Sequence, residues 1–255
     1  MNIVPLASSS KGNAYLVERA GMTLLIDCGL SYRELGRRMR EHGASVDSIA
    51  AVLITHSHTD HISGLEMLLK KHDLPVYANM MTAEAIAAGG KVPEEAFVCF
   101  ENGQTFDLGA FTVHPFSIPH DTSDPVGFLV SAPRPGGEGA ETYFHGTDIG
   151  TPLDSIGLKL AEADVATLES NHDPVMLRTS GRAPSLIQRI AGPRGHLSND
   201  QAAGLVKKFA SPRLKKLFLA HLSQDCNTPN LAERAMREAL AEIGREDIEL
   251  EVLEP

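Results

Sequence analysis

Three histidines and one aspartate lie within six residues of one another, in the stretch Thr55-His56-Ser57-His58-Thr59-Asp60-His61. The stretch directly follows an apolar run at 50–54, which predicts a buried strand that ends in a short loop rich in metal ligands. Neutral imidazole and carboxylate groups at this spacing suit zinc, manganese or iron. A histidine-rich surface turn is the alternative, but imidazoles held together repel one another once they are protonated. We therefore expect a metal-binding loop, which we call the metal loop (residues 55–61).

Other side chains that can bind metal ions also follow predicted strands. His120, Asp148 and His221 each come directly or shortly after such a strand. Each has an ordinary alternative, because a lone histidine is often structural and an aspartate among glycines is often a turn residue. Asp27 closes the apolar strand predicted at 22–26, where a charge is costly unless it is hydrogen-bonded. We expect Asp27 to hold the metal loop in place through hydrogen bonds.

The H-x-H-x-D-H pattern of the metal loop resembles the signature of the metallo-β-lactamase superfamily, and the later residues resemble its further ligand motifs. The resemblance implies an αββα four-layer sandwich and a site for two divalent ions, zinc or manganese, with iron as a third option. Such ions would share a bridging hydroxide, and a single-metal site is the alternative. The implied ligands are His56, His58 and His120 on one ion, Asp60, His61 and His221 on the other, and Asp148 on both.

Length and periodicity agree with one domain. The 255 residues suffice for one large α/β domain, 42% of them are hydrophobic, and we find no repeat or long linker, so we expect a single domain over 1–255. The predicted strands are 2–6, 14–17, 22–26, 50–54, 75–78, 97–100, 104–107, 111–116, 126–131, 142–145, 165–168, 217–220 and 248–252. The predicted helices are 30–42, 62–71, 82–88, 153–160, 183–190, 199–209 and 231–243.

Two further motifs bear on the reaction. Glu169 opens Glu-Ser-Asn-His-Asp at a strand end, and His196 lies in Gly-His-Leu-Ser-Asn before a predicted helix. Glu169 and His196 resemble the proton-donating pair of tRNA 3′-processing enzymes in this superfamily, and with Asp60 they are the predicted catalytic residues. His172 either contacts substrate or a metal ion, or is an ordinary hydrogen-bonded histidine. The helix start near Arg194 is a predicted phosphate-binding site. The substrate-binding candidates are Asn171, His172, Arg194, Ser198 and Asn199.

The charge distribution is uneven. The chain carries a net charge of -10, yet the segment from Arg178 to Lys216 contains nine basic residues and one acid, Asp200. A basic zone in an acidic protein can attract a polyanion to one face. A solvated helix face explains the charges equally well.

Taken together, the metal loop and the motifs around His120, Glu169, His196 and His221 resemble those of the YycJ-like subgroup of bacterial metallo-β-lactamase-fold hydrolases. Members of this subgroup are regarded as DNA exonucleases acting from the 5′ end. The resemblance implies a metal-dependent phosphodiester hydrolase with DNA as its substrate. A cyclic-phosphate phosphodiesterase or an RNA-processing nuclease of the same fold is the enzymatic alternative. A metal-stabilised nucleic-acid-binding protein is the non-enzymatic one. The Pro/Gly-rich stretch 131–140 looks longer than a tight hairpin requires.

Three observations bear on location. Cys28, Cys99 and Cys226 are odd in number and widely separated, which favours reduced thiols in the cytoplasm over a disulfide framework. Residues 1–6 lack the charged and apolar regions of a signal peptide. No apolar run of about eighteen residues predicts a membrane-spanning helix. The sequence carries no indication of oligomeric state.

Overall fold

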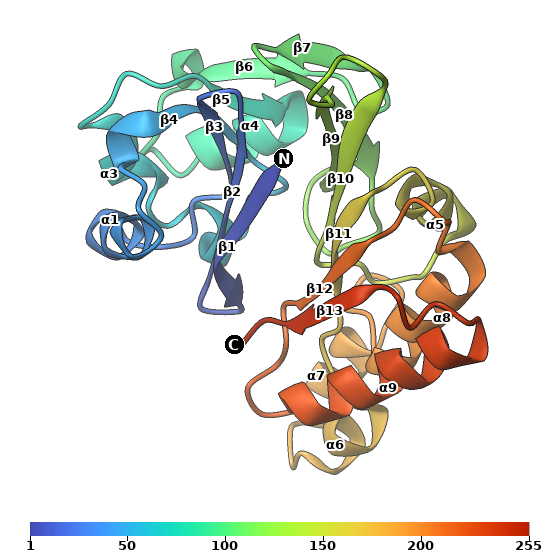
Figure 1. Cartoon of the computed structure of the whole chain (residues 1–255). Helices are drawn as coiled ribbons and strands as arrows, with labels where there is room; N and C mark the ends of the chain where they lie inside the picture. The colour runs from blue at the N-terminus through green and yellow to red at the C-terminus, as the bar shows by residue number, and fades with distance from the viewer. Residues whose placement is uncertain (255) are drawn as a thin grey trace. The chain divides into compact units, whose positions relative to one another are not determined.

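The computed structural model describes residues 1–254, which divide into two compact units. Unit 1 comprises residues 1–117 and 122–126, and unit 2 comprises residues 118–121 and 127–254 (Figure 1). Residue 255, the last of the predicted domain, lies outside the described residues. The assignment of 1–255 to one domain stays a prediction.

Unit 1 is built on a six-stranded mixed sheet in the order β1-β2-β3-β4-β5-β6. The first three strands pair antiparallel and the rest pair parallel. Its central strands are apolar and almost completely buried, as expected for a sheet covered on both faces. The strands are β1 (Asn2–Ser9), β2 (Gly12–Arg19), β3 (Met22–Ile26), β4 (Ile49–Leu53), β5 (Val76–Asn79) and β6 (Phe97–Phe100), followed by the hairpin of β7 (Phe106–Leu108) and β8 (Phe111–Ser117).

Two helices of unit 1, α1 (Tyr32–Glu41) and α3 (Leu65–Leu69), bury apolar side chains in its core. Helix α1 begins after Ser31, whose hydroxyl accepts a hydrogen bond from the Glu34 amide, and it buries Leu35 and Met39 in the core. Helix α3 buries Leu65 and Leu68 in the same core and contacts α1 (Figure 1). The helices are α1 (Tyr32–Glu41), α2 (Thr59–Ile62), α3 (Leu65–Leu69) and α4 (Met80–Ala87).

The single helix predicted at 62–71 is wrong, because the chain forms two short helices with a break at Gly64. The Gly64 amide donates a 2.8 Å hydrogen bond to the carbonyl of Cys28. A Cβ atom at this position would lie 1.9 Å from the Leu30 carbonyl oxygen. The backbone at Gly64 therefore packs directly on the segment that follows β3, which a continuous amphipathic pattern does not reveal.

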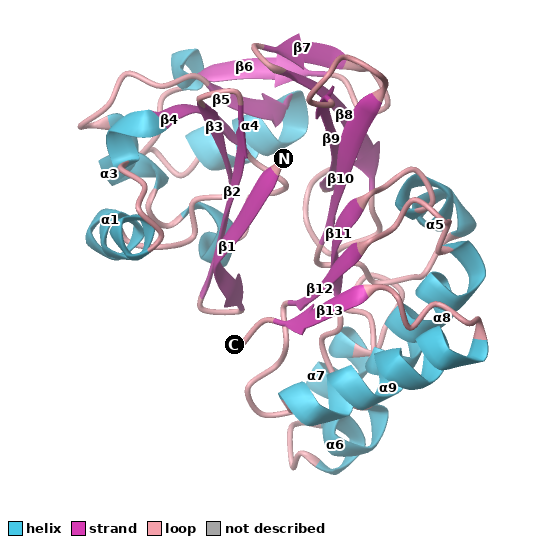
Figure 2. Cartoon of the chain, viewed as in Figure 1, coloured by secondary structure: helices cyan, strands magenta, loops and turns pink. Residues whose placement is uncertain are grey.

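Unit 2 contains five strands in the order β13-β12-β11-β10-β9. Strands β9 and β10 pair antiparallel, and the others pair parallel. Figure 2 shows helices α5, α8 and α9 on the same side of β11–β13, and α8 contacts both of the others. The strands are β9 (Val126–Pro133), β10 (Ala140–Gly146), β11 (Val165–Glu169), β12 (Lys216–Ala220) and β13 (Glu249–Val252), and the helices are α5 (Asp154–Leu160), α6 (Pro174–Thr179), α7 (Pro184–Ile190), α8 (Asn199–Phe209) and α9 (Pro229–Glu242).

Two features of unit 2 differ from the sequence expectations. The loop predicted around 132–140 is shorter, because β9 and β10 pair as far as Pro133 and Ala140. Helix α6 was not predicted, although Asp173 caps it through the amides of Val175 and Met176. By contrast, α8 begins and ends where its periodicity predicts, and Ser198 forms a capping box with Gln201.

Two observations bear on the location of the protein. The three cysteines are free thiols, with Cys28 and Cys226 buried and Cys99 exposed. Among residues 1–254, no helix is both long enough and apolar enough to cross a membrane.

Candidate metal centre

The metal loop of unit 1 joins β4 to α2. His58 is the N-cap of α2, and Asp60 and His61 lie in the helix itself. Gly29 permits the close packing of this loop, since a Cβ atom there would lie 1.6 Å from the Asp60 carbonyl oxygen. The loop is thus held in place by the backbone that follows β3.

Asp27 is the hydrogen-bond acceptor behind the metal loop. Its Oδ1 accepts from the Thr55 amide at 2.9 Å, and its Oδ2 lies 2.7 Å from Nδ1 of His61. The Thr55 hydroxyl also lies within hydrogen-bond distance of both carboxylate oxygens. Asp27 and His61 are fully buried. The predicted supporting position of Asp27 is therefore confirmed.

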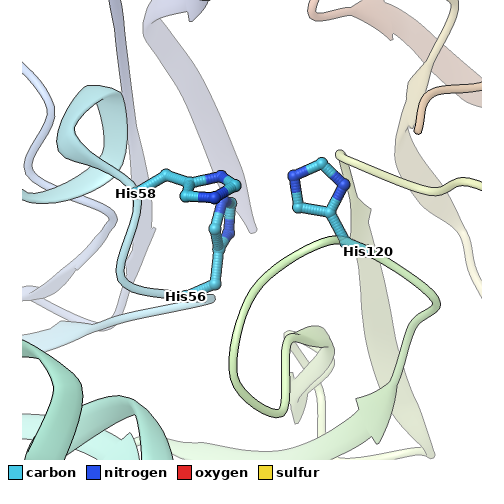
Figure 3. Close-up of side chains that lie close together, drawn as sticks. All are labelled: His56, His58 and His120. Atoms are coloured by element: carbon cyan, nitrogen blue, oxygen red, sulfur yellow. The ribbon is translucent and has the colours of Figure 1, made fainter. Parts of the chain in front are cut away.

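The histidines of the metal loop present their rings to one another. The rings of His56 and His58 are edge-to-face with centroids 4.8 Å apart, and the centroid of His61 lies 4.0 Å from that of His56. Figure 3 shows the first two rings on the same loop, together with His120, which belongs to unit 2. Nδ1 of His56 lies 3.0 Å from the Thr55 hydroxyl, which can accept its proton while donating to Asp27.

Asn13 is a neighbour of the metal loop that the sequence reasoning did not select. Its Nδ2 lies 3.1 Å from Nε2 of His61, 3.3 Å from Oδ2 of Asp60 and 3.0 Å from the Ser9 carbonyl. The side chain is fully buried, and no hydrogen bond reaches its Oδ1. The only sequence signal was its place in the polar turn between the first two predicted strands.

In unit 2, four titratable side chains come together from four separate segments. Asp148 follows β10, Glu169 ends β11, His196 precedes α8, and His221 follows β12. Each offers a ligand atom, and these atoms all lie within 4.8 Å of one another. All but His196 are almost completely buried. The structure therefore brings the predicted bridging carboxylate together with one predicted ligand and the predicted proton-donating pair.

Glu169 is the centre of this cluster. Its Oε2 accepts hydrogen bonds from the amides of Ile149 (2.8 Å) and Leu197 (3.0 Å). Its Oε1 accepts from Nδ1 of His196 (2.8 Å) and from Nδ1 of His221 (2.9 Å). Both oxygens are thus engaged by the protein, which identifies Glu169 as a group that holds the imidazoles rather than as a metal ligand.

His120 lies in the same unit and is held in the same way. Its Nδ1 lies 3.0 Å from the Gly195 carbonyl oxygen, next to His196 in the chain. Its Nε2 lies 3.6 Å from Oδ1 of Asp148 and 3.5 Å from Oδ1 of Asp121. The third predicted histidine ligand therefore lies beside the predicted bridging carboxylate.

The cluster sets the protonation of its central pair. Burial alone would raise the pKa of Glu169, but the neighbouring His196 and its hydrogen bonds hold that pKa well below its usual range. Burial alone would lower the pKa of His196, but the charge of Glu169 and the hydrogen bond to it raise the pKa above its usual value. Both shifts favour an ionised carboxylate on Glu169 and a protonated imidazole on His196.

Three residues of the two clusters have left-handed backbone conformations. The φ angles are 59° for Asp27, 59° for Asp148 and 57° for His221, and each residue directly or closely follows a strand. Such a conformation costs a residue other than glycine about 1–2 kcal/mol. Backbone strain of this kind persists where the surrounding structure fixes it, and it is common at functional sites.

The predicted substrate-binding residues have different surroundings. Asn199 is buried, accepting from Ser170 at 2.7 Å and exchanging hydrogen bonds with Asn227 at 2.9 Å. Asn171 donates to the His221 carbonyl at 2.8 Å, and Ser198 caps α8. These side chains join the loops around the cluster, and their contact with substrate stays a prediction.

The remaining two candidates are His172 and Arg194. His172 is 3% exposed, no hydrogen bond reaches its Nδ1, and burial lowers its pKa. Arg194 is exposed. The roles of both residues also stay predictions.

The donor set fits divalent metal ions. Four of the predicted histidine ligands have an oxygen acceptor 2.7–3.0 Å from Nδ1, which assigns the proton to Nδ1 and the lone pair to Nε2; they are His56, His61, His120 and His221. Fixing a ligand imidazole by hydrogen bonding its other nitrogen is the usual arrangement in zinc sites. Both units therefore present imidazoles prepared for metal binding through Nε2.

Comparison with known proteins gives consistent matches along the chain. A family model described as a β-lactamase superfamily domain matches residues 22–221. Exodeoxyribonuclease WalJ of Streptococcus pneumoniae serotype 2 (strain D39 / NCTC 7466) is 33% identical over 240 residues, covering 93% of this chain and 87% of that protein. Exodeoxyribonuclease YycJ of Bacillus anthracis is 33% identical over 249 residues, covering 94% of this chain and 89% of that protein.

A solved structure also matches over the whole chain. The metallo-β-lactamase fold protein YhfI from Bacillus subtilis has a TM-score of 0.71 at 17% identity, covering 99% of this chain and 96% of that one. The likeness confirms the predicted fold class, an αββα fold with two mixed sheets and flanking helices.

Proposed function

The chain belongs to the metallo-β-lactamase superfamily and is a metal-dependent hydrolase, and from that premise we propose that it is a DNA exonuclease that degrades its substrate from 5′ to 3′. The observation that carries the proposal is the 33% identity over 93% of the chain to a protein named exodeoxyribonuclease. The cluster around Glu169 supports it, because it supplies an imidazole suited to protonating a leaving oxygen.

The proposed centre binds two divalent ions, zinc or manganese. His56, His58 and His120 would hold one ion, Asp60, His61 and His221 the other, and Asp148 both. Such ions would supply Lewis acidity for a phosphoryl oxygen and would lower the pKa of water to near neutrality. The Nδ1 hydrogen bonds of the histidines support this assignment, because they orient Nε2 as the ligand atom.

His196 is the proposed general acid. Breaking a phosphodiester bond leaves an alkoxide oxygen that must take up a proton, and the raised pKa of His196 favours the protonated form that can donate one. Glu169 orients the ring through Nδ1 and stabilises its charge, so the proton that is transferred is the one on Nε2. The side chain of His196 is 22% exposed, which leaves an edge for substrate, whereas Glu169 is fully buried.

A side-by-side assay of three substrates tests the proposal. Metal-loaded protein is incubated with end-labelled DNA, end-labelled RNA or small cyclic phosphodiesters. We expect mononucleotide release from DNA labelled at the 5′ end, with slower or no hydrolysis of the other substrates. His58→Ala is the matched control, since it removes a predicted ligand from a half-exposed position. Faster hydrolysis of RNA or of a cyclic phosphodiester would reassign the substrate, and products of mixed length would indicate an endonuclease.

Metal analysis tests the centre separately. Protein purified without chelator and reconstituted with zinc or manganese should retain two ions per chain after gel filtration. A maximum of one ion would contradict the shared role of Asp148. We also propose a cytoplasmic location, because the three cysteines are free thiols.

A further inference from the structure

The basic zone between Arg178 and Lys216 divides into two parts with different surroundings. In the second part, side chains pair with acids: Lys207 with Glu242, Lys208 with Asp154 at 2.7 Å, Arg213 with Asp164 at 2.9 Å, Lys215 with Asp247 at 3.7 Å, and Lys216 with Glu249 at 2.7 Å. Their charge is therefore largely balanced within unit 2. The first part differs, and we call it the arginine excursion (residues 174–197).

The arginine excursion contains four arginines and no acidic residue. Arg178 and Arg194 are exposed, and neither has an acidic partner among residues 1–254. Arg182 pairs with Asp225 at 2.7 Å and Arg189 with Asp121 at 2.6 Å. Each pair has one exposed partner, since the side chains of Asp225 and Arg189 are 76% and 65% exposed, whereas those of Arg182 and Asp121 are 28% and 25% exposed. Pairs open to solvent on one side contribute little stability, so a phosphate can compete for the guanidinium.

Core packing accounts for only part of the excursion, which buries Leu177 and Leu197. It comprises α6 and α7 with their loops, and it connects β11 to α8 (Figure 1). Helix α7 has no fully buried residue, and Val175 on α6 is 55% exposed. The connection between two parallel strands is already made by α8. A segment that is ordered, exposed and rich in one charge fits contact with a ligand better than it fits support of the core.

The excursion is attached to the loops that carry the candidate site in unit 2. Arg189 pairs with Asp121, which follows His120, and the Gly195 carbonyl accepts from Nδ1 of His120 at 3.0 Å. The His196 amide donates to the Ile190 carbonyl at 2.9 Å, so α7 leads directly into the proposed general acid. A polymer bound along α6 and α7 would therefore continue into the Glu169 cluster.

We propose that the arginine excursion is the surface that grips the nucleic-acid backbone next to the site, an inference that rests on the proposed phosphodiesterase function. Guanidinium groups suit this task because they bind phosphate oxygens through two parallel hydrogen bonds. Four arginines along one segment neutralise successive phosphates without reading sequence. The excursion thus explains how a chain of net charge -10 holds a polyanion.

The test compares two double variants that remove the same charge. Arg178→Gln with Arg194→Gln removes the two arginines without acidic partners. Lys207→Gln with Lys208→Gln removes two paired lysines from the last turn of α8. That turn lies about 15 Å along the helix axis from Ser198, at 1.5 Å per residue. The probe is a 3′-labelled, phosphorothioate-linked single-stranded oligonucleotide, and its binding to metal-loaded protein is followed by fluorescence anisotropy across a salt series.

We expect the arginine variant to bind the oligonucleotide about tenfold more weakly than wild type at moderate salt. The slope of log affinity against log salt concentration should shrink in magnitude by about 1.4, or about 0.7 for each lost phosphate contact. The lysine variant should keep the wild-type slope. Equal losses in both variants, or an unchanged slope in the arginine variant, would overturn the inference. So would binding of polyglutamate as tight as that of DNA, because the surface would then favour an acidic protein.

Hydrolysis of bis(4-nitrophenyl) phosphate by the wild-type protein separates the two claims. If the protein hydrolyses this small substrate but binds no nucleic acid, the excursion assignment fails and the phosphodiesterase survives. If it binds the oligonucleotide with the expected difference between variants but hydrolyses neither substrate, the excursion assignment holds and the proposed function fails.

Discussion

Nδ1 of His221 donates a 2.9 Å hydrogen bond to Oε1 of Glu169, and both side chains are buried. The same oxygen accepts a 2.8 Å hydrogen bond from Nδ1 of His196. One carboxylate atom therefore orients a predicted metal ligand and the proposed general acid. In the proposed mechanism Glu169 would couple metal binding to proton transfer, so its loss should affect both, whereas loss of His196 should affect only proton transfer.

Glu169→Gln should lower metal affinity about 10- to 100-fold, the usual effect of losing a group that orients a ligand, and should also lower turnover. The glutamine side chain has only one oxygen that can accept hydrogen bonds. Its nitrogen, a donor, would face either the two backbone amides or the two imidazoles, and all four of these groups are donors that need an acceptor. Competition with a chromogenic chelator measures the affinity. His196→Gln is the matched control, with lower turnover and near-native affinity. Native metal affinity in Glu169→Gln would show that the hydrogen bond from His221 to Glu169 is dispensable for metal binding.

His196→Gln should also reveal the acid role through the leaving group. A general acid contributes about 10²–10⁴-fold when the leaving oxygen is a poor one. Nitrophenolate needs little protonation, so the variant should lose far less on a nitrophenyl phosphodiester than on an alkyl one. Rates across a series of leaving groups measure the difference. His172→Gln provides the comparison, because burial lowers the pKa of His172 and disfavours its protonated form. Equal losses on all substrates in the His196 variant would exclude the acid role.

Local patterns in the sequence were sufficient for much of the fold. The helix at 199–209 was predicted to the residue, because Ser198 caps it and its apolar period is regular. The metal loop was equally clear from residue types alone. The split at Gly64 was not, since it depends on contact with Cys28 and Leu30 far away in the chain. Helix α6 was missed because six residues are too few to establish a helical period.

The coupling through Glu169 depends on strand register, which no local pattern specifies. Glu169 pairs with Ala220 across β11 and β12, so His221 emerges directly beside it. The sequence suggested the pair of Glu169 and His196 only by resemblance, and gave no reason to join His221 to it. Asn13 depends similarly on the register of β1 and β2, whose last pair is Ser9 with Gly12. The charge pattern could not show which basic residues pair with acids, such as Lys208 with Asp154.

Asp148→Asn should abolish hydrolysis, by at least about 100-fold, while keeping or raising the stability of the metal-free fold. Asparagine tolerates the φ angle of 59° and places no second carboxylate beside Glu169. Asp148→Ala should also lose activity but should be about 1–2 kcal/mol less stable, because alanine is strained in this conformation. Denaturant unfolding measures both variants. Equal stability of the two would argue against stored strain, and native turnover in either would remove the shared-ligand role.

Asn13→Ala should strengthen zinc binding several-fold, because Nδ2 of Asn13 lies 3.1 Å from Nε2 of His61 and donates into the lone pair that a metal ion would take. Asn2→Ala is the matched control, since Asn2 is exposed and donates only to Glu18 at the edge of the same hairpin. Isothermal titration with zinc measures affinity and stoichiometry together. Indistinguishable affinities in the two variants would reduce Asn13 to a residue that merely fills the turn.

Asp164→Asn should cost about 2 kcal/mol of unfolding free energy at pH 7, the usual loss for a hydrogen bond to a charged group. Burial alone would raise the pKa of Asp164, but hydrogen bonds from Arg213, the Thr142 amide and Arg134 lower it. Because the pKa of Asp164 is lower in the folded state, its charge stabilises the fold at pH values above its unfolded-state pKa, near 4. This contribution is lost as the pH falls through the folded-state pKa.

The difference between wild type and this variant should therefore be largest above about pH 5 and should narrow under more acidic conditions. Denaturant unfolding between pH 3 and pH 7 measures it. Asp154→Asn is the control, because its pair with Lys208 is exposed and its loss should change stability little at any pH. A difference for Asp164→Asn that stays constant over the whole range would mean that its hydrogen bonds, and not its charge, support the end of β10.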